Sequence, residues 1–389
     1  HSCRPMHAGI KSRLQTKCMR FPVNLCRQYC LFAGAHWATP RKSCVHADRI
    51  IIKLSPFTTR SIKMTSRTLL KFSLVNSLLA LSISSAIAAT ASSSPLTAGI
   101  VNNAALLDTV DATASHAAIL RAQILLDRAH FSPGEIDASF GGNMRNAISA
   151  YQANRGLTVS GVIDAATWSS LNKDDLPVLS SYKITDTDAA GPFVAIPASM
   201  LAKSKLPSLA YASATEALGE KFHVSPRLLM QLNAGKHFDK AGEEIIVPNV
   251  LSPEPLPAAT SVVVDRSDAS VSLLDAEGKI IARYPASSGS KYDPLPVGNW
   301  KINGVSSNPV FHYNPKLFWD AKPKSEKAKI PAGPNNPVGV VWVDLSKEHY
   351  GIHGTPEPSK IGKTESHGCI RLSNWDATSF AAAVSPGMP

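Results

Sequence analysis

The sequence has few cysteines in the region where a secreted fold would need them for disulfides. Five of its six cysteines (Cys3, Cys18, Cys26, Cys30 and Cys44) lie in residues 1–63, and residues 64–389 contain only Cys369. A single thiol cannot form a disulfide within that region, so a disulfide framework is excluded there. Residues 1–63 contain no CxxC pair, which leaves a basic, metal-binding extension as a weakly supported alternative.

A net charge is also absent from most of the chain. The full sequence carries +11, but residues 1–63 hold 12 Lys/Arg and the single acid Asp48, whereas residues 64–389 hold 28 Lys/Arg and 28 Asp/Glu. A nucleic-acid-binding domain is expected to carry its positive charge on the folded part of the chain. Nucleic acid is therefore not an expected partner.

No hydrophobic run is long enough to favour a membrane helix. The apolar run at 72–83 is short for a span, follows two basic residues and precedes Ala86-Ile87-Ala88, which is the layout of a secretory signal. We therefore expect translation to begin at Met64. Residues 1–63 are then upstream sequence outside the natural mature protein, 64–88 are a signal peptide, and the protein is exported to the periplasm or cell envelope.

Two small modules and two linkers are expected before the C-terminal third. Residues 89–110 are rich in Ala and Ser and are typical of a linker. In residues 111–173, apolar side chains recur at helical spacing between Gly- and Pro-containing turns. A second module is expected at 180–250, followed by a stiff Pro-rich linker at 251–259.

The first module shows a pattern of small, apolar and turn residues along its whole length. The pattern consists of Ile136-Asp137, Gly141, Ala147-Ile148, Tyr151-Gln152, Gly156-Leu157, Gly161, Ile163-Asp164, Thr167-Trp168 and Leu171. With these residues the module resembles the peptidoglycan-binding domain family. The resemblance implies a small all-α domain that binds the cell wall. A three-helix spacer with an ordinary core is the alternative.

The second module carries a weaker pattern. It consists of residues 218–225, Leu228-Leu229, Leu232-Asn233 and residues 241–248. These residues resemble a LysM module, an α+β unit whose family binds glycans containing N-acetylglucosamine. The residues before Leu218 fit that family poorly, so a structural role in positioning the next domain is the alternative. We expect His223 and His237 to be surface histidines and not ligands.

From residue 260 the chain has the pattern of a β protein. Strand-like runs lie at residues 262–264, 271–274, 280–284, 300–302 and 338–345. Glu277-Gly278 supplies the turn of a hairpin between the second and third runs. One helix is expected at about 375–384, capped by Ser373 or Asn374.

Cys369 lies among polar residues and glycine in Ser366-His367-Gly368-Cys369, sixteen residues after His353. A histidine within reach can accept the thiol proton and generate the thiolate, the nucleophilic form of cysteine. The pattern predicts acyl transfer with Cys369 as nucleophile and His353 as base. A buried structural thiol is one alternative. A zinc site is the other, with ligands His349, His353, His367 and Cys369.

Residues 260–389 resemble the catalytic domain of the L,D-transpeptidase (YkuD) family over their whole length. Besides the cysteine motif, the resemblance rests on residues 331–339, His353-Gly354-Thr355 and residues 371–377 in the family's order. Arg371 stands where the strictest family motif has Asn, a variant of Gram-negative envelope enzymes. The resemblance implies a multidomain protein with a mainly β catalytic domain, a YkuD-type β-sandwich.

The resemblance also implies the reaction. Cys369 would attack the tetrapeptide stem of peptidoglycan at the bond between the diamino acid and D-Ala. An amine of a second stem would resolve the thioester as a 3→3 cross-link, or a lysine of an outer-membrane lipoprotein would do so. No cofactor or metal is expected. Carbapenem-type inhibitors are expected to acylate Cys369, and the cellular roles implied are cell wall biogenesis and cell shape.

Further site residues are expected around this pair. His367 would tune the thiolate or orient the substrate, and the motif residues Ser366, Gly368 and Gly354 would shape the turn and the oxyanion site. Substrate contacts are expected from Arg371, Thr355 and Asn336. The Arg371 guanidinium suits a substrate carboxylate, and a surface ion pair is equally compatible with the sequence.

Three further alternatives remain open at this level. The same Cys369–His353 pair with water as acceptor would give an L,D-carboxypeptidase or a hydrolase that detaches lipoprotein. A non-catalytic wall-binding protein would need only residues 111–250. A loop with four lysines at 322–329 would either cover the site as a lid or remain a solvated loop.

Overall fold

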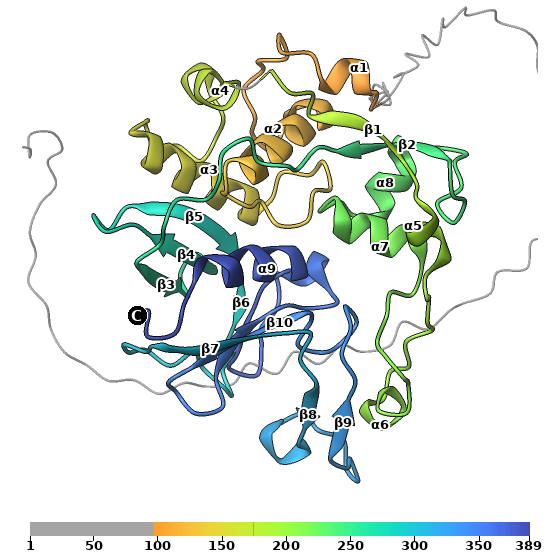
Figure 1. The fold of residues 1–389 in the computed structure, drawn as a ribbon. Helices are drawn as coiled ribbons and strands as arrows, with labels where there is room; N and C mark the ends of the chain where they lie inside the picture. Colours follow the sequence, from red (N-terminus) through yellow and green to blue (C-terminus); the bar gives the residue numbers. More distant parts are fainter. Residues whose placement is uncertain (1–95, 174) are drawn as a thin grey trace, which may run out of the picture. The chain divides into compact units, whose positions relative to one another are not determined.

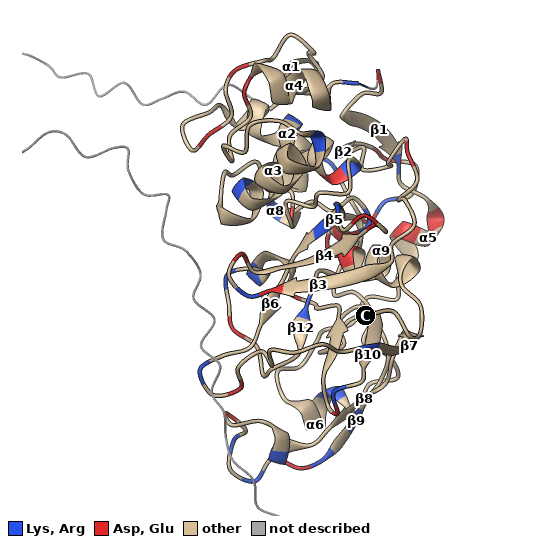
Figure 2. Ribbon diagram, turned by 90° about the vertical axis from the view of Figure 1, so that its left-hand side faces the viewer, with Lys and Arg blue, Asp and Glu red and all other residues tan. Residues whose placement is uncertain are grey.

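The computed structural model describes residues 96–173 and 175–389, whose helices and strands are arranged as Figure 1 shows. The predicted upstream segment, 1–63, and signal peptide, 64–88, lie outside the described residues. Within the described part, no helix has the length and apolar character needed to cross a bilayer. Basic and acidic residues are interspersed along it (Figure 2), in addition to being equal in number over residues 64–389.

The first module is helical, as predicted. Its helices are α1 (Ala98–Val101), α2 (His116–Arg128), α3 (Gly142–Arg155) and α4 (Ala165–Leu171). The Ser115 hydroxyl caps α2, and the Asp164 carboxylate caps α4. Helix α1 falls inside the segment predicted to be a linker. Because its Val101 is fully buried, this end of the segment belongs to the folded region.

The second module is an α+β unit. Its elements are β1 (Leu179–Lys183), α5 (Asp186–Ala190), α6 (Met200–Lys203), α7 (Ala214–Lys221), α8 (Pro226–Leu232) and β2 (Glu244–Pro248). Strands β1 and β2 pair antiparallel. Buried side chains of this module, such as Leu218 and Ile245, belong to the same apolar core as those of α2 and α3. The two modules therefore share one hydrophobic core.

The prediction of a surface position is confirmed for His237, whose side chain is exposed, and holds only in part for His223, whose side chain is 24% exposed. The His223 ring stacks on Trp375 with 5.2 Å between ring centroids. Its Nδ1 lies 2.9 Å from Oδ2 of Asp127 on α2. Side chains from two other parts of the chain cover the ring, which the local sequence around position 223 does not reveal.

The C-terminal region is mainly β. Its strands are β3 (Ser261–Asp265), β4 (Ser270–Leu274), β5 (Ile280–Pro285), β6 (Ser287–Ser288), β7 (Ile302–Ser307), β8 (Phe311–Tyr313), β9 (Ala328–Ile330), β10 (Val341–Leu345), β11 (Gly351–His353) and β12 (Ile370–Arg371). Two short 3-10 helices, Pro315–Leu317 and Pro358–Lys360, and helix α9 (Asn374–Ala383) complete it. The predicted hairpin of β4 and β5 is confirmed, as is the Ser373 cap of α9.

These strands form a three-stranded sheet, β3-β4-β5, a five-stranded sheet, β6-β12-β11-β10-β7, and the hairpin β8-β9. The two larger sheets and α9 contribute side chains such as Leu273, Val343 and Phe380 to one core, as in a β-sandwich. β10 begins at Val341 and not at residue 338. Gly339, with φ of +63°, adopts a turn conformation that a strand cannot contain.

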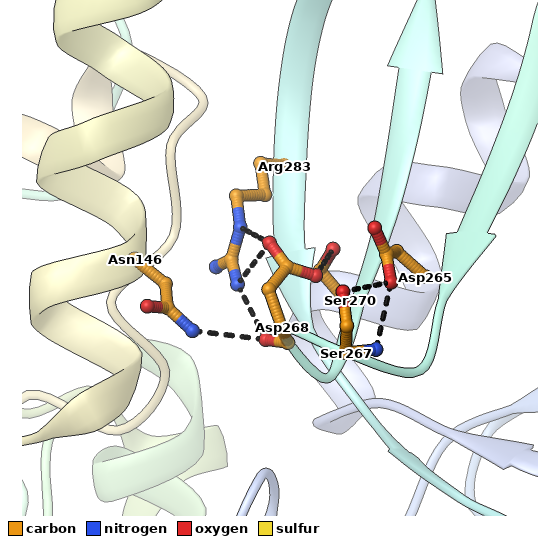
Figure 3. A network of polar contacts seen from close by, with 6 residues as sticks. All are labelled: Asn146, Asp265, Ser267, Asp268, Ser270 and Arg283. Atoms are coloured by element: carbon orange, nitrogen blue, oxygen red, sulfur yellow. Dashed lines mark hydrogen bonds and ion pairs between the residues drawn. The ribbon is translucent and has the colours of Figure 1, made fainter. Parts of the chain in front are cut away.

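The helical module contacts the C-terminal region by donating hydrogen bonds to its main-chain carbonyls. Figure 3 shows Asn146 of α3 donating to the Asp268 carbonyl at 3.0 Å, beside the Asp268–Arg283 ion pair. Asn143 donates to the Ile361 carbonyl, and Asn154 to the Ile280 carbonyl. Three asparagines on one helix thus hold three separate segments of the C-terminal region.

Candidate active site

A row of side chains crosses the five-stranded sheet on one face. The strand register pairs Ser306 with Trp342, Trp342 with His353, and His353 with Arg371. Cys369 precedes β12 and lies two residues before Arg371. Because side chains two residues apart in a strand share a face, Cys369 is expected on the face that carries His353. All five residues line one cavity of about 1670 Å³.

His353 is held in one orientation. Its ring is buried, stacks on Trp342 with 5.5 Å between centroids, and bonds through Nδ1 to the Gly354 carbonyl at 2.7 Å. A carbonyl only accepts, so Nδ1 must carry the proton and Nε2 must present a lone pair. Burial lowers the pKa of His353 to about 4, although the bond to Gly354 opposes this, and Arg371 lowers it further. The imidazole is therefore a neutral base at physiological pH.

Cys369 is protonated in the resting site. Burial raises the pKa of its thiol, against the effect of a hydrogen bond from the Gly351 amide. The thiol donates to the His349 carbonyl with an Sγ to O distance of 3.6 Å. It must turn away from this carbonyl to pass its proton to His353.

The turn that carries Cys369 is fixed by its neighbours. Gly368 has φ of +93°, and a Cβ there would lie 2.9 Å from Tyr350 Cε1, so both conformation and space require glycine. The Ser366 hydroxyl is buried, accepts from the Gly289 amide at 2.7 Å and donates to the Cys369 carbonyl at 2.6 Å. These contacts position the Cys369 thiol by constraining its backbone.

His367 points toward a different partner. Its Nε2 lies 2.8 Å from Oδ1 of Asp320, and its ring contacts Phe318 and Trp319. These three partners belong to the loop between β8 and β9, which also carries Lys322, Lys324 and Lys327 of the four lysines, whereas Lys329 lies in β9. His367 thus joins the turn of Cys369 to this loop, and Lys322 and Lys324 of the loop line the cavity.

Two of the three predicted substrate contacts line the cavity, Arg371 and Thr355. Arg371 forms no ion pair within the described ranges and donates to Thr364 Oγ1 at 3.0 Å, while its Nε is buried without a partner. The third prediction, Asn336, is wrong. Its side chain is fully buried and donates to the Pro331 carbonyl at 2.7 Å, so it stabilises a loop.

Three groups that contribute to the site were not predicted from the sequence. These are Trp342, which covers one face of the His353 ring, the Gly354 carbonyl, which fixes its tautomer, and Tyr350, which packs against Gly368. The alternation Val341-Trp342-Val343 indicates that Trp342 faces away from the core. The partners across the sheet depend on register, which one sequence does not provide.

The four residues of the zinc alternative do not form a metal site. Across residues 96–173 and 175–389, no three His, Cys, Asp or Glu side chains gather closely enough to hold a metal ion. His349 is largely exposed and lies near Glu348, while His367 is bonded to Asp320. The zinc alternative therefore has no ligand set in this part of the chain.

Two family models match the chain, the YkuD L,D-transpeptidase catalytic domain over residues 259–389 and a "Putative peptidoglycan binding domain" over residues 115–171. A relative from Bacillus licheniformis, named "Putative L,D-transpeptidase YkuD", is 30% identical over 174 residues, which are 44% of this chain and 88% of that protein. The chain belongs to the YkuD family of L,D-transpeptidases. It is accordingly an enzyme, and the family's activity depends on cysteine.

Further relatives of this L,D-transpeptidase include "Probable L,D-transpeptidase YbiS" of Escherichia coli strain K12, with 35% identity over 82 residues, 20% of this chain and 26% of that one. Among solved structures, the catalytic domain of the E. faecium L,D-transpeptidase acylated by ertapenem matches with a TM-score of 0.26 and 17% identity. That match covers 34% of this chain and 95% of the other.

Proposed function

We propose that Cys369 is the nucleophile of this L,D-transpeptidase and His353 its general base. The observation that carries the proposal is the placement of both side chains in one cavity, with His353 held neutral by burial and oriented by the Gly354 carbonyl. A neutral imidazole can accept the thiol proton as sulfur attacks a carbonyl. The resulting imidazolium can then protonate the leaving amine.

The proposed donor is the tetrapeptide stem of peptidoglycan. The Cys369 sulfur forms a thioester with the carbonyl of the third residue, a diamino acid, and the C–N bond to D-Ala breaks as D-Ala takes the proton from His353. A side-chain amine then attacks the thioester, loses its proton to His353 and releases the thiol. A second stem would give a 3→3 cross-link, and a lipoprotein lysine would give protein attachment.

The proposed oxyanion site is the turn of residues 366–369. The positive φ of Gly368 and the two hydrogen bonds of Ser366 fix this turn. Main-chain amides next to the nucleophile are suited to stabilise the negative oxygen that develops during attack. Gly354 contributes through its carbonyl, and Thr355 and Arg371 line the cavity where the peptide would lie.

The accessory modules are proposed to bind the cell wall. The match of residues 115–171 to a peptidoglycan-binding family supports this for the helical module. For residues 180–250, the order of two strands around α7 and α8 supports a LysM-like unit, with a long insertion between β1 and α7. An exported location in the periplasm, a signal peptide at 64–88, roles in wall biogenesis and cell shape, and acylation of Cys369 by carbapenems complete the proposal.

The test is incubation of the purified protein with tetrapeptide muropeptides, followed by mass analysis of the products. We expect a cross-linked dimer and free D-Ala from the wild type and neither product from Cys369→Ala. His349→Gln is the matched control, because His349 has a largely exposed side chain and lies near the turn that carries Cys369. Tripeptide without dimer would indicate hydrolysis, and turnover by Cys369→Ala would refute the assignment of the nucleophile.

A further inference from the structure

The second module sends a long insertion to the catalytic region. It leaves the module after α5 and returns at α7, and its central contact is a pair of main-chain hydrogen bonds at Leu209. The Leu209 amide donates to the Ala332 carbonyl, and its carbonyl accepts from the Asn335 amide, both at 2.9 Å. The Asn335 side chain also donates to the Ala210 carbonyl and to Glu216 on α7.

The catalytic region is shaped to receive this insertion. At Gly333 a Cβ would lie 2.2 Å from the Leu209 carbonyl oxygen, so only glycine permits the approach. The Leu209 side chain is fully buried and packs with Tyr313 and Ile330 of the β8–β9 hairpin. Met200 of α6 packs against the same cluster. The insertion is therefore fixed against the catalytic region.

The insertion forms one wall of the catalytic cavity. Ile196, residues 198–201 and Lys203 line the same cavity as Cys369 and His353, and this set includes part of α6. At about 1670 Å³, this cavity exceeds the roughly 300–1,000 Å³ typical of a site for one small molecule. It has room for an extended peptide that reaches from the nucleophile to this wall.

The chemically distinctive group on this wall is the ammonium of Lys203. Lys203 is half-buried and lines the cavity, and burial lowers its pKa, against the attraction of Glu357. Glu357 is already paired with Lys360, and within the described residues the Lys203 ammonium forms no ion pair or hydrogen bond, although its main chain bonds to Ser199 and Leu206. The lysines of the loop, Lys322 and Lys324, are by contrast exposed, where water weakens their interactions.

We propose that Lys203 binds a carboxylate of the stem peptide, so that the insertion of the second module is part of the substrate site. This proposal rests on the proposed function, which makes a stem peptide the ligand of the cavity. A half-buried cation gains most from an anion that replaces the water around it. Lys203 is a binding residue in this role and takes no part in bond making.

The experiment compares four proteins on a free-acid stem and on its single-carboxamide derivatives. Wild type, Lys203→Ala, Lys203→Arg and the control Lys205→Ala are assayed for D-Ala release from a tetrapeptide stem with free carboxylates. The same proteins are assayed with stems in which each carboxylate in turn, except that of D-Ala, is a carboxamide. Lys205 is a suitable control because it is exposed and lies two residues from Lys203 outside the cavity lining.

We expect Lys203→Ala to raise KM for the free-acid stem by about tenfold, the effect of losing one charge-assisted contact, with kcat changed little. Lys203→Arg should restore most of the affinity. With one carboxamide stem, wild type and Lys203→Ala should have the same KM, which identifies the carboxylate bound.

An active Lys203→Ala enzyme with the KM of the wild type on every stem would overturn the proposal and leave the catalytic assignment intact. The same holds if Lys205→Ala raises KM as much as Lys203→Ala. Failure of the wild type to act on any stem would instead refute the proposed function. Circular dichroism of each variant separates loss of binding from loss of folding.

Discussion

The protonation state of His353 can be tested directly through the pH dependence of acylation. Its pKa is lowered from 6.5 to about 4, chiefly by burial. At about pH 5.5, an imidazole with a pKa near 4 is about 97% neutral, whereas one with the ordinary value is about 9% neutral. An enzyme that needs neutral His353 should therefore keep nearly its full rate at this pH, where an ordinary histidine would cost about tenfold.

The assay is kcat/KM for D-Ala release, measured from about pH 4 to pH 8, because this ratio reports the pKa values of the free enzyme. A parallel series follows acylation by a carbapenem with intact-protein mass spectrometry. His349→Gln is the control for titration of a neighbouring histidine. An acid limb with its midpoint near 6.5 in both wild type and control would refute a buried, neutral base.

The resting protonation state of the thiol can be tested by alkylation. Burial raises the pKa of Cys369, so the free enzyme should hold thiol and neutral imidazole, without a thiolate–imidazolium pair. Alkylation of Cys369 by iodoacetamide should then increase with pH throughout the neutral range. Rapid alkylation that is independent of pH between about 5 and 7 would show a preformed thiolate and contradict this description.

Three further predictions follow from single contacts. Gly354→Ala would place Cβ 2.2 Å from Asn374 Oδ1 and displace the carbonyl that orients His353. The value of kcat/KM for D-Ala release should therefore fall about 100-fold. An unchanged value would exclude a role of this carbonyl in orienting His353. Trp342→Ala should admit water to His353 and move the acid limb of the pH profile upward. Burial raises the pKa of Asp376 from 3.8 to about 7. The free energy of unfolding should therefore be highest below pH 3.8 and should fall by up to about 4 kcal/mol as pH rises through about 7. In Asp376→Asn this fall should be absent, as measured by urea unfolding across the pH range.

Much of the catalytic region was predictable from local patterns. The strand-like runs at residues 262–264, 271–274 and 280–284 located β3, β4 and β5, and the turn at Gly278 located the hairpin of β4 and β5. The motif around Cys369 and the histidine at 353 indicated two residues that line one cavity. Such features are encoded within a few residues, where strand period and turn chemistry are decisive.

The remaining features depend on contacts between distant segments. His223 looked like a surface residue in the sequence, since the two residues that cover it, Asp127 and Trp375, come from other elements. Asn336 looked like a ligand because a polar side chain in a motif of glycine and proline gives no sign of burial. Lys203 lies in a stretch that fits no family pattern, and its position in the cavity follows from the contact of Leu209 with residues 332–335.

The three asparagines of α3 have a consequence for how this enzyme can change during evolution. Asn143, Asn146 and Asn154 all donate to peptide carbonyls, and every residue type supplies the same carbonyl. The receiving segments can therefore accumulate substitutions without loosening this attachment. If an asparagine is lost, in contrast, no side-chain substitution in the receiving segment can restore the hydrogen bond, because the acceptor is a main-chain carbonyl. Compensating pairs of mutations should therefore be rare between α3 and these segments.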